Sequence, residues 1–359
     1  MTTTRPADEP VDDLDHARDR ARMLWWLSGF GVALVLVLLL ATGLGPVSVP
    51  PLTVARIIGH HTAGIPATAD WSTAQDSIVW LVRVPRVLLG ALVGAALAVA
   101  GAVLQTLVRN VLADPHILGV TSGASTGAAV SLLFGGSVAA GALAASAFTG
   151  AAVATALLFA IAHLNGQMTS LRLLLGGVTI GYLFSAATSF LIFASDDQEG
   201  ARTVLFWLLG SLGSAAWSSV ATTTAVTVAA IAALVLLATR LDMLAAGDDT
   251  ARALGLSPGR LRMIVLAIVA LAIGGVVAVA GAIGFVGLIV PHVARLCVGA
   301  GHRRLLPLSA LLGALFLVVA DVVARLAFAP RELPLGIVTA VVGAPLLLVL
   351  VRRFQQSPH

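Results

Sequence analysis

The chain consists of long apolar runs separated by short polar connections. Of its 359 residues, 58% are hydrophobic and 11% are charged, whereas soluble domains carry about 25% charged residues. A helix needs roughly 20 mostly apolar residues to cross a bilayer. The runs that meet or approach this length are 24–44, 87–108, 116–134, 138–163, 172–194, 216–239, 263–280, 282–299, 305–328 and 335–351. We therefore expect an all-α polytopic membrane protein with about ten transmembrane helices.

The remaining segments predict the domain organisation. Residues 1–22 are rich in both carboxylates and arginines and poor in apolar side chains, which is typical of a disordered cytosolic tail. The membrane domain is expected over 23–353, followed by a short cytosolic tail at 354–359. The apolar run 201–213 is too short to span a bilayer, so we expect a short helix lying at one face.

The distribution of arginine predicts the orientation. Cytoplasmic loops of membrane proteins carry an excess of basic residues. When the N-terminus is taken as cytoplasmic, most arginines fall in cytoplasmic segments, and the acidic residues Asp196, Asp197 and Glu199 fall outside. Ten spans then return the C-terminus to the cytoplasm. We expect both termini on the cytoplasmic side of the cell membrane.

Three compositional features exclude other classes of protein. The arginines are spread between the apolar runs, whereas a nucleic-acid-binding surface gathers them in one patch. The chain has no lysine, which excludes a Walker A phosphate-binding loop. Its one cysteine, Cys297, excludes an intrachain disulfide and a multi-thiolate metal site. If ATP drives this protein, another chain must bind it.

The segment 240–262 is the most informative polar stretch. Leu244, Ala251 and Leu254 are spaced to form one apolar stripe of a short helix. The polar face of that helix would hold Asp248, Asp249 and Arg252.

The same segment contains a helix stop followed by a helix start. Gly255 suits the left-handed end of a helix, and Ser257 followed by Pro258 suits the beginning of the next one. A helix, a glycine break and a new helix form a projection that can dock in the groove of a partner. An ordinary interfacial loop is equally compatible with the composition.

Charged residues near the spans allow several interpretations. Asp321 and Arg325 are four residues apart near one end of a span, where pairing avoids an isolated charge in lipid. Arg83 and Arg86 have no acid nearby in the sequence, so they can extend to lipid headgroups or bind an acidic partner. Asp114, which precedes a proline, predicts a structural helix cap.

Small residues recur at spacings of four, as in Gly90, Gly94 and Ala98, and again from Gly119 to Gly127. This spacing lets helix backbones approach closely in lipid. The second series also contains Gly-Ala-Ser125-Thr-Gly, which matches the G-x-S-x-G motif of serine hydrolases. That motif normally follows a strand, and here it lies within an apolar run, so helix packing is favoured.

Two further readings of single residues are minor. An intramembrane serine hydrolase would need Ser125 together with His163 or His292 as the base, which makes it a remote alternative. His60 and His61 form a weak metal-binding pattern because no third ligand is close in the sequence. We expect no metal site in this chain.

Many ordered stretches are similar to one family. They are Arg83-Val-Pro-Arg86, Gly94 to Gly101 with Gln105, Arg109-Asn110, Asp114-Pro115, Leu118-Gly119-Val120, Ser122-Gly123-Ala124, Leu173 to Gly177, Trp207 to Ser211, Ala253 to Leu256, Gly284 to Gly287, Pro291-His292, Ala294-Arg295, His302 to Arg304, Glu332-Leu-Pro334 with Gly336, and Gly343-Ala-Pro345. Over about 80–353, the chain resembles FecCD-type permease subunits of type II ABC importers. It departs from them at Asn110-Val111, where many members have Asn-Pro, and in its longer acidic tail.

The resemblance implies a function and a set of partners. Such a subunit forms a homodimer or heterodimer around a central path, works with two cytoplasmic ATPase subunits, and receives ligand from an external binding protein. The permease itself is not an enzyme and binds no cofactor, because ATP and Mg belong to the ATPase. The expected substrate is a ferric siderophore, then haem, then cobalamin. A secondary, ion-coupled transporter is the main alternative.

The resemblance also implies three groups of functional residues. The ATPase-coupling residues are Asp248, Ala251, Arg252, Leu254, Gly255 and Leu256. The residues that receive acidic side chains of the binding protein are Arg83, Arg86 and Arg325. The cytoplasmic gate is expected at Thr169, Ser170 and Leu171.

Overall fold

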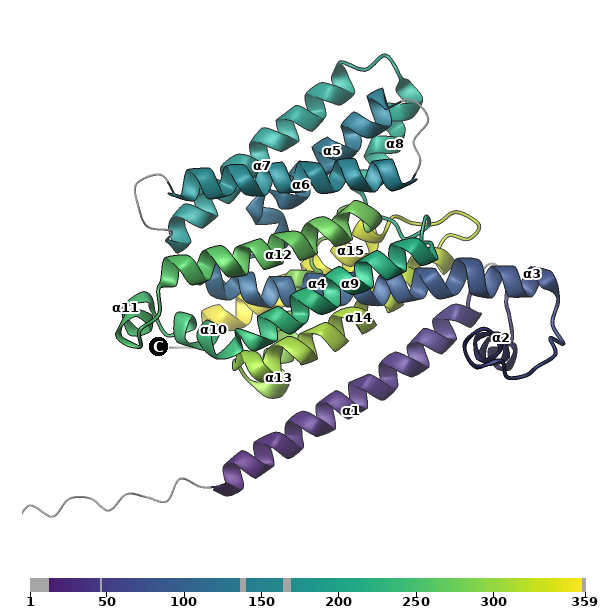
Figure 1. Cartoon of the computed structure of the whole chain (residues 1–359), viewed down its shortest axis with the longest axis horizontal. Helices are drawn as coiled ribbons and strands as arrows, with labels where there is room; N and C mark the ends of the chain where they lie inside the picture. Colours follow the sequence, from purple (N-terminus) through teal and green to yellow (C-terminus); the bar gives the residue numbers. More distant parts are fainter. Residues whose placement is uncertain (1–12, 46, 136–139, 164–168, 357–359) are drawn as a thin grey trace, which may run out of the picture.

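The computed structural model describes residues 13–45, 47–135, 140–163 and 169–356, and the regular structure of these residues is entirely helical (Figure 1). The helices are α1 (Asp13–Gly43), α2 (Pro51–Ala63), α3 (Thr73–Asp76), η1 (Ser77–Arg83), α4 (Val84–Val108), η2 (Pro115–Leu118), α5 (Val120–Phe134), α6 (Ala140–His163), α7 (Ser170–Phe193), α8 (Gln198–Leu208), α9 (Trp217–Leu236), α10 (Ala238–Ala245), α11 (Asp248–Ala253), α12 (Pro258–Ala280), α13 (Val286–Val298), α14 (His302–Leu326) and α15 (Leu335–Gln356).

Each of the ten expected spans corresponds to an apolar helix. In the described residues, seven helices are long and apolar enough to cross a membrane, and three shorter ones add Val120–Phe134, Val286–Val298 and Leu335–Val349. The prediction of an all-α polytopic membrane protein is confirmed. The run at 282–299 gives a shorter helix than expected because Gly281 and Phe285 both have positive φ angles, 69° and 68°, which end α12 and delay the start of α13.

Helix α4 is the centre of the bundle, surrounded by α9, α12, α13 and α14. Two of its glycines permit this close packing. A Cβ atom added at Gly94 would lie 2.1 Å from the carbonyl oxygen of Gly313 in α14, and one at Gly101 would lie 1.9 Å from that of Gly287 in α13. Both distances are impossible for a real side chain, so the expected packing of small residues is confirmed.

Helices α5, α6 and α7 form a second group beside this centre (Figure 1). Gly123 of α5 faces Gly150 of α6, and a Cβ at Gly123 would lie 2.5 Å from the Gly150 carbonyl oxygen. Helix α12 joins the two groups through contacts with α4 and α6. The expected short helix at 201–213 exists as α8, which ends before the left-handed Gly210.

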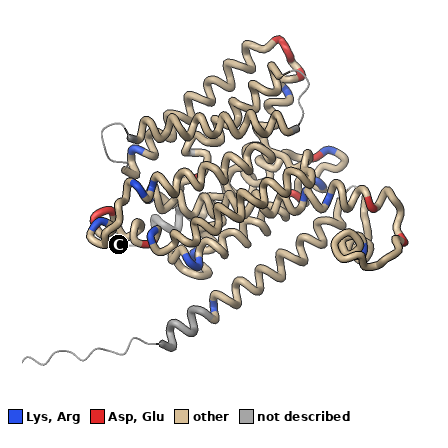
Figure 2. The backbone as a smooth tube through the Cα atoms, viewed as in Figure 1, with Lys and Arg blue, Asp and Glu red and all other residues tan. Residues whose placement is uncertain are grey.

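The bundle has two distinct ends (Figure 2). The end that carries α10 and α11, called the α11 end, holds arginines near the start of α1, α7, α12 and α14. The opposite end, called the α2 end, carries α2, α3 and α8 and a mixture of arginines and acidic residues.

Three features differ from or extend the expectations. Helix α2 was not expected, because 51–63 is too short and polar to span. The helix expected from residue 87 extends back to residue 73. Its π-helical part is η1, after which the Val84 N–H donates a hydrogen bond to the Val79 carbonyl, just before Pro85. Helix α1 begins at Asp13, so the second half of the expected N-terminal tail is helical, while 1–12 and 357–359 lie outside the described residues.

Candidate functional site

The segment that joins α9 to α12 forms a compact projection at the α11 end (Figure 1). Helix α10 ends near Gly247, α11 follows it, and Gly255 precedes α12. Gly247 and Gly255 have φ angles of 128° and 80°, values that glycine adopts without steric cost. The expected helix, glycine break and new helix are therefore present, with one additional break at Gly247.

The projection has a buried side and an exposed tip. Leu244 and Ala251 are fully buried, whereas Leu254 is 57% exposed. The prediction of one continuous apolar stripe is therefore wrong for Leu254. Leu254 follows Ala253, the last residue of α11, as the C-cap, so helical spacing from Ala251 no longer sets where its side chain lies. Arg252 and Gly255 are also exposed, and Leu256 is half-buried.

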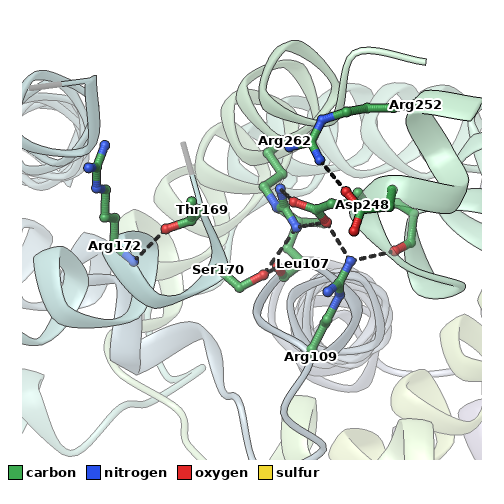
Figure 3. A network of polar contacts seen from close by, with 10 residues as sticks. Leu107, Arg109, Thr169, Ser170, Arg172, Asp248, Arg252 and Arg262 are labelled. Carbon is green, nitrogen blue, oxygen red and sulfur yellow. Dashed lines mark hydrogen bonds and ion pairs between the residues drawn. The ribbon is translucent and has the colours of Figure 1, made fainter. Parts of the chain in front are cut away.

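The carboxylate of Asp248 fixes the projection to the bundle (Figure 3). It accepts hydrogen bonds from Arg262 at 2.9 and 2.7 Å and also binds Arg109. The hydrogen bonds from Arg262, together with the nearby arginine charges, hold the pKa of Asp248 below its ordinary value. The expected polar face is thus partly internal, because Asp248 binds the bundle while Asp249 is exposed and pairs with Arg252 at 2.7 Å.

Arg262 extends this contact to the start of α7. Its side chain is almost completely buried, and Nη2 donates to Ser170 Oγ at 3.1 Å. Ser170 Oγ in turn donates to the Leu107 carbonyl of α4 at 2.8 Å. Figure 3 shows these groups converging from four segments of the chain. We call Leu107, Arg109, Ser170, Asp248 and Arg262 the Arg262 network.

The other two expected gate residues lie beside this network. Thr169 is the N-cap of α7, and its hydroxyl accepts a hydrogen bond from Arg172 N at 3.4 Å. Leu171 is exposed. The structure thus brings the expected gate and the expected coupling segment together through Ser170 and Arg262, a contact that sequence reasoning missed because 92 residues separate them.

A second buried contact anchors α10. His302, the first residue of α14, has Nδ1 2.5 Å from Asp242 Oδ1 and Nε2 2.9 Å from the hydroxyl of Thr106 in α4. The His302 backbone N–H also donates to Asp242 at 3.0 Å. This contact too was missed by sequence reasoning. Together with the Arg262 network, it ties the projection to α4 at two places.

At the α2 end, Arg86 binds two acids. Its Nε donates to Asp321 Oδ1 at 3.0 Å, and its two Nη atoms donate to the carboxylate oxygens of Glu332 at 2.9 Å each. Arg86 has no acid nearby in the sequence, as expected, but two acids that are distant in the sequence bind it in the folded bundle. The expected pairing of Asp321 with Arg325 is present, with Nε and Oδ2 3.0 Å apart.

Arg83 and Arg325 bind the end of α1. Arg83 donates to the carbonyls of Thr42 and Gly43 at 3.1 and 2.9 Å. Arg325 donates to those of Leu44 and Ala41 at 2.8 and 3.1 Å. Arg83, Arg86 and Arg325 are only 5%, 7% and 4% exposed, so all three have structural contacts in this conformation. Their role in receiving a binding protein stays a prediction.

The minor candidate sites have ordinary structural explanations. Ser125 lies inside α5 and donates to the Thr121 carbonyl at 2.9 Å, so it is not on a strand-to-helix turn. His292 lies in α13, and the side chain of His163 is outside the described ones. His61 contacts the Asp76 carboxylate at 3.1 Å. Asp114 caps η2 by accepting from His116 N at 2.9 Å, as expected.

A bundle of apolar helices around a tightly packed centre, with a projection held at one end, is the architecture of a polytopic membrane protein. Comparison with known proteins agrees with this class. The FecCD transport family matches residues 33–353, so the chain belongs to that family. It is a multi-pass cell-membrane protein and a permease subunit of an ABC importer.

Individual relatives cover nearly the whole chain. The cobalamin import system permease protein BtuC of Halobacterium salinarum is 40% identical, with 92% of this chain and 97% of the relative aligned. The vitamin B12 import system permease protein BtuC of Vibrio cholerae is 44% identical over 80% of this chain and 86% of the relative. A solved inward-facing structure of a metal-chelate type ABC transporter is 34% identical, with a TM-score of 0.80, covering 91% of this chain and 98% of that one.

Proposed function

We propose that this chain forms the membrane path of a cobalamin importer. The support is that two relatives, at least 40% identical over most of the chain, are named as cobalamin or vitamin B12 import permeases. A ferric siderophore, which the resemblance alone placed first, and haem are the alternatives. Uptake of radiolabelled cobalamin, a ferric siderophore and haem by cells that depend on this permease distinguishes them. Uptake of an iron complex without cobalamin contradicts the proposal.

The partners follow from the class of transporter. ABC importers combine permease subunits with ATPases and a substrate-binding protein. We infer that the α11 end faces the cytoplasm, with both termini on that side, and binds the ATPase through the tip of the projection. The observation that carries this inference is the apolar side chain of Leu254, which is exposed at the end of α11. At the start of the same helix, Asp248 binds the bundle through Arg262. ATP and Mg would bind to the ATPase subunit.

ATP-driven transport separates this function from that of a secondary transporter. Purified complexes in vesicles should hydrolyse ATP faster when a loaded binding protein is added, and should accumulate ligand only with ATP. Uptake driven by a proton gradient in ATP-free vesicles contradicts the proposal. Ser125→Ala should leave transport unchanged, because that hydroxyl only donates within its own helix.

We propose further that the path runs between this permease and a second copy or a homologous subunit, with a cytoplasmic gate at Thr169, Ser170 and Leu171. Thr169 and Leu171 are exposed at the beginning of α7. This exposure leaves both side chains free to contact a second permease subunit across the path. The size of the complex with and without a tagged second copy tests whether the dimer is made of identical chains.

The proposed docking of the binding protein on Arg83, Arg86 and Arg325 needs a specific test because these arginines are buried. Glu332 covers Arg86, and the Glu332 side chain is 42% exposed. An acidic side chain of the binding protein must therefore compete with Glu332 for this guanidinium. Glu332→Gln should accelerate association at low ionic strength, since exposed charges act mainly on the association rate. An unchanged rate would assign Arg86 to the fold alone.

A further inference from the structure

Arg262 lies where the ATPase-facing projection meets the first turn of α7. Its Nη2 is 2.7 Å from Asp248 Oδ1 of α11 and 3.1 Å from Ser170 Oγ of α7. One guanidinium group therefore holds both segments at the same time (Figure 3). A planar guanidinium fixes the angle between its partners as well as their distance.

Each partner of Arg262 is also held on its other side. Asp248 binds Arg109 at the end of α4, and Ser170 donates to the Leu107 carbonyl of the same helix at 2.8 Å. Because the Arg262 side chain is only 1% exposed, water cannot replace a lost partner without opening this region. Removing one partner of a buried ion pair strongly destabilises the fold, because the remaining charge is left buried and uncompensated. Displacement of α11 must therefore either carry the start of α7 with it or break several contacts together.

We propose that Arg262 is a positioning residue that transmits the movement of α11 to the first turn of α7. The inference rests on the proposed function, in which α11 contacts the ATPase and the start of α7 gates the path. In this arrangement, the movement passes from the exposed tip of α11 to Asp248, then to Arg262, and then to Ser170.

The contact of Asp242 with His302 provides a matched control. It anchors the same projection, but its hydrogen bonds run to His302 of α14 and, through His302, to Thr106 of α4 rather than toward α7. Asp242→Asn and Asp248→Asn each remove one carboxylate charge from this segment with little change in shape. Only Asp248→Asn disturbs the path to Ser170.

The experiment uses the complete complex in lipid nanodiscs. Amide hydrogen exchange at residues 170–174 is compared with and without ADP and vanadate, and transported ligand per ATP hydrolysed is measured in vesicles. We expect Arg262→Met to retain ATP hydrolysis, to lose the nucleotide dependence of exchange at the start of α7, and to reduce transport per ATP by about 5-fold or more. Asp242→Asn should keep that nucleotide dependence.

Ser170→Ala gives an independent test in case Arg262→Met does not fold, because it removes only a hydroxyl group. It should reduce transport per ATP, and its effect should not add to that of Asp248→Asn, since both interrupt one path. Additive effects, or an Arg262→Met complex with normal exchange and normal transport per ATP, overturn the proposal. A wild-type complex that does not hydrolyse ATP overturns the proposed function itself, and the inference with it.

Discussion

Asp321 and Arg86 form a buried ion pair across 235 residues of sequence, with Arg86 Nε 3.0 Å from Asp321 Oδ1. Asp321 also pairs with Arg325, so one carboxylate balances two arginines. Asp321→Asn should lower the free energy of unfolding by about 3 kcal/mol, because Arg325 loses its charged partner in a buried site and Arg86 loses the buried one of its two acidic partners. Thermal unfolding in detergent measures this loss.

Glu332→Gln is the control for that substitution. It removes the other acid that binds Arg86, but its side chain is partly exposed, so water can replace the lost charge. A loss of about 1 kcal/mol or less is expected. If the two substitutions destabilise the protein equally, the buried position of Asp321 has no special importance.

Leu254→Asp should prevent the ATPase from co-purifying with the permease while the fold is retained. The reason is that Leu254 is exposed at the tip of the projection, so a charge there costs little in the isolated chain but is buried in a complex. Leu52→Asp is the matched control, because Leu52 is a leucine of similar exposure, 72%, on α2 at the opposite end. Normal co-purification of the Leu254→Asp variant would move the ATPase contact elsewhere.

Gly101→Ala should destabilise the protein severely. Its added methyl group would lie 1.9 Å from the Gly287 carbonyl oxygen, so α4 and α13 would have to separate, at a cost of about 1–3 kcal/mol or more. Gly29→Ala tests the same change where no atom lies within 4 Å, and there alanine should stabilise the helix by about 1 kcal/mol. Folded yield and melting temperature compare the two variants. Equal behaviour would contradict the packing described for α4.

The pH dependence of the projection follows from Asp248. Its pKa is lowered in the folded state by the hydrogen bonds of Arg262, so its carboxylate stabilises the fold at pH values above the unfolded pKa of about 3.9. This stabilisation is lost as the pH falls from there through the lower folded pKa. The difference in melting temperature between wild type and Asp248→Asn should stay constant from pH 7 to 5 and shrink below about pH 4. A difference that already shrinks between pH 7 and 5 would contradict this origin.

Cysteine substitution tests the gate. Thr169→Cys in a Cys297→Ser background should crosslink to the second permease subunit in one nucleotide state and not in the other. Thr169 is the better position because its hydroxyl accepts a hydrogen bond from Arg172 N of its own helix, whereas Ser170 belongs to the Arg262 network. Crosslinking that is independent of nucleotide would argue for an ordinary turn at this position.

The elements set by local chemistry were predictable from the sequence. Apolar runs gave the helices, Asp114 gave a cap, and the break at Gly255 was visible in the residue types. The partners of Arg86 and Arg262 were not, because Glu332 and Ser170 are distant in the chain and only the packed bundle brings them close. Leu254 was misplaced because the spacing rule assumes that the helix continues, and α11 ends at Ala253, so Leu254 is its C-cap.

The hydrogen bonds that Arg83 and Arg325 donate to the end of α1 have a consequence for biogenesis. Helix α1 has no buried residue in its most apolar window, and the carbonyls at its end, which no helical N–H can reach, are bound by side chains from η1 and α14. Because α14 follows α1 in the chain, the end of α1 obtains one of these partners only when α14 has been synthesised. Until then the end of α1 lacks one of its two arginine donors, so α1 is fully anchored only late in the assembly of the bundle.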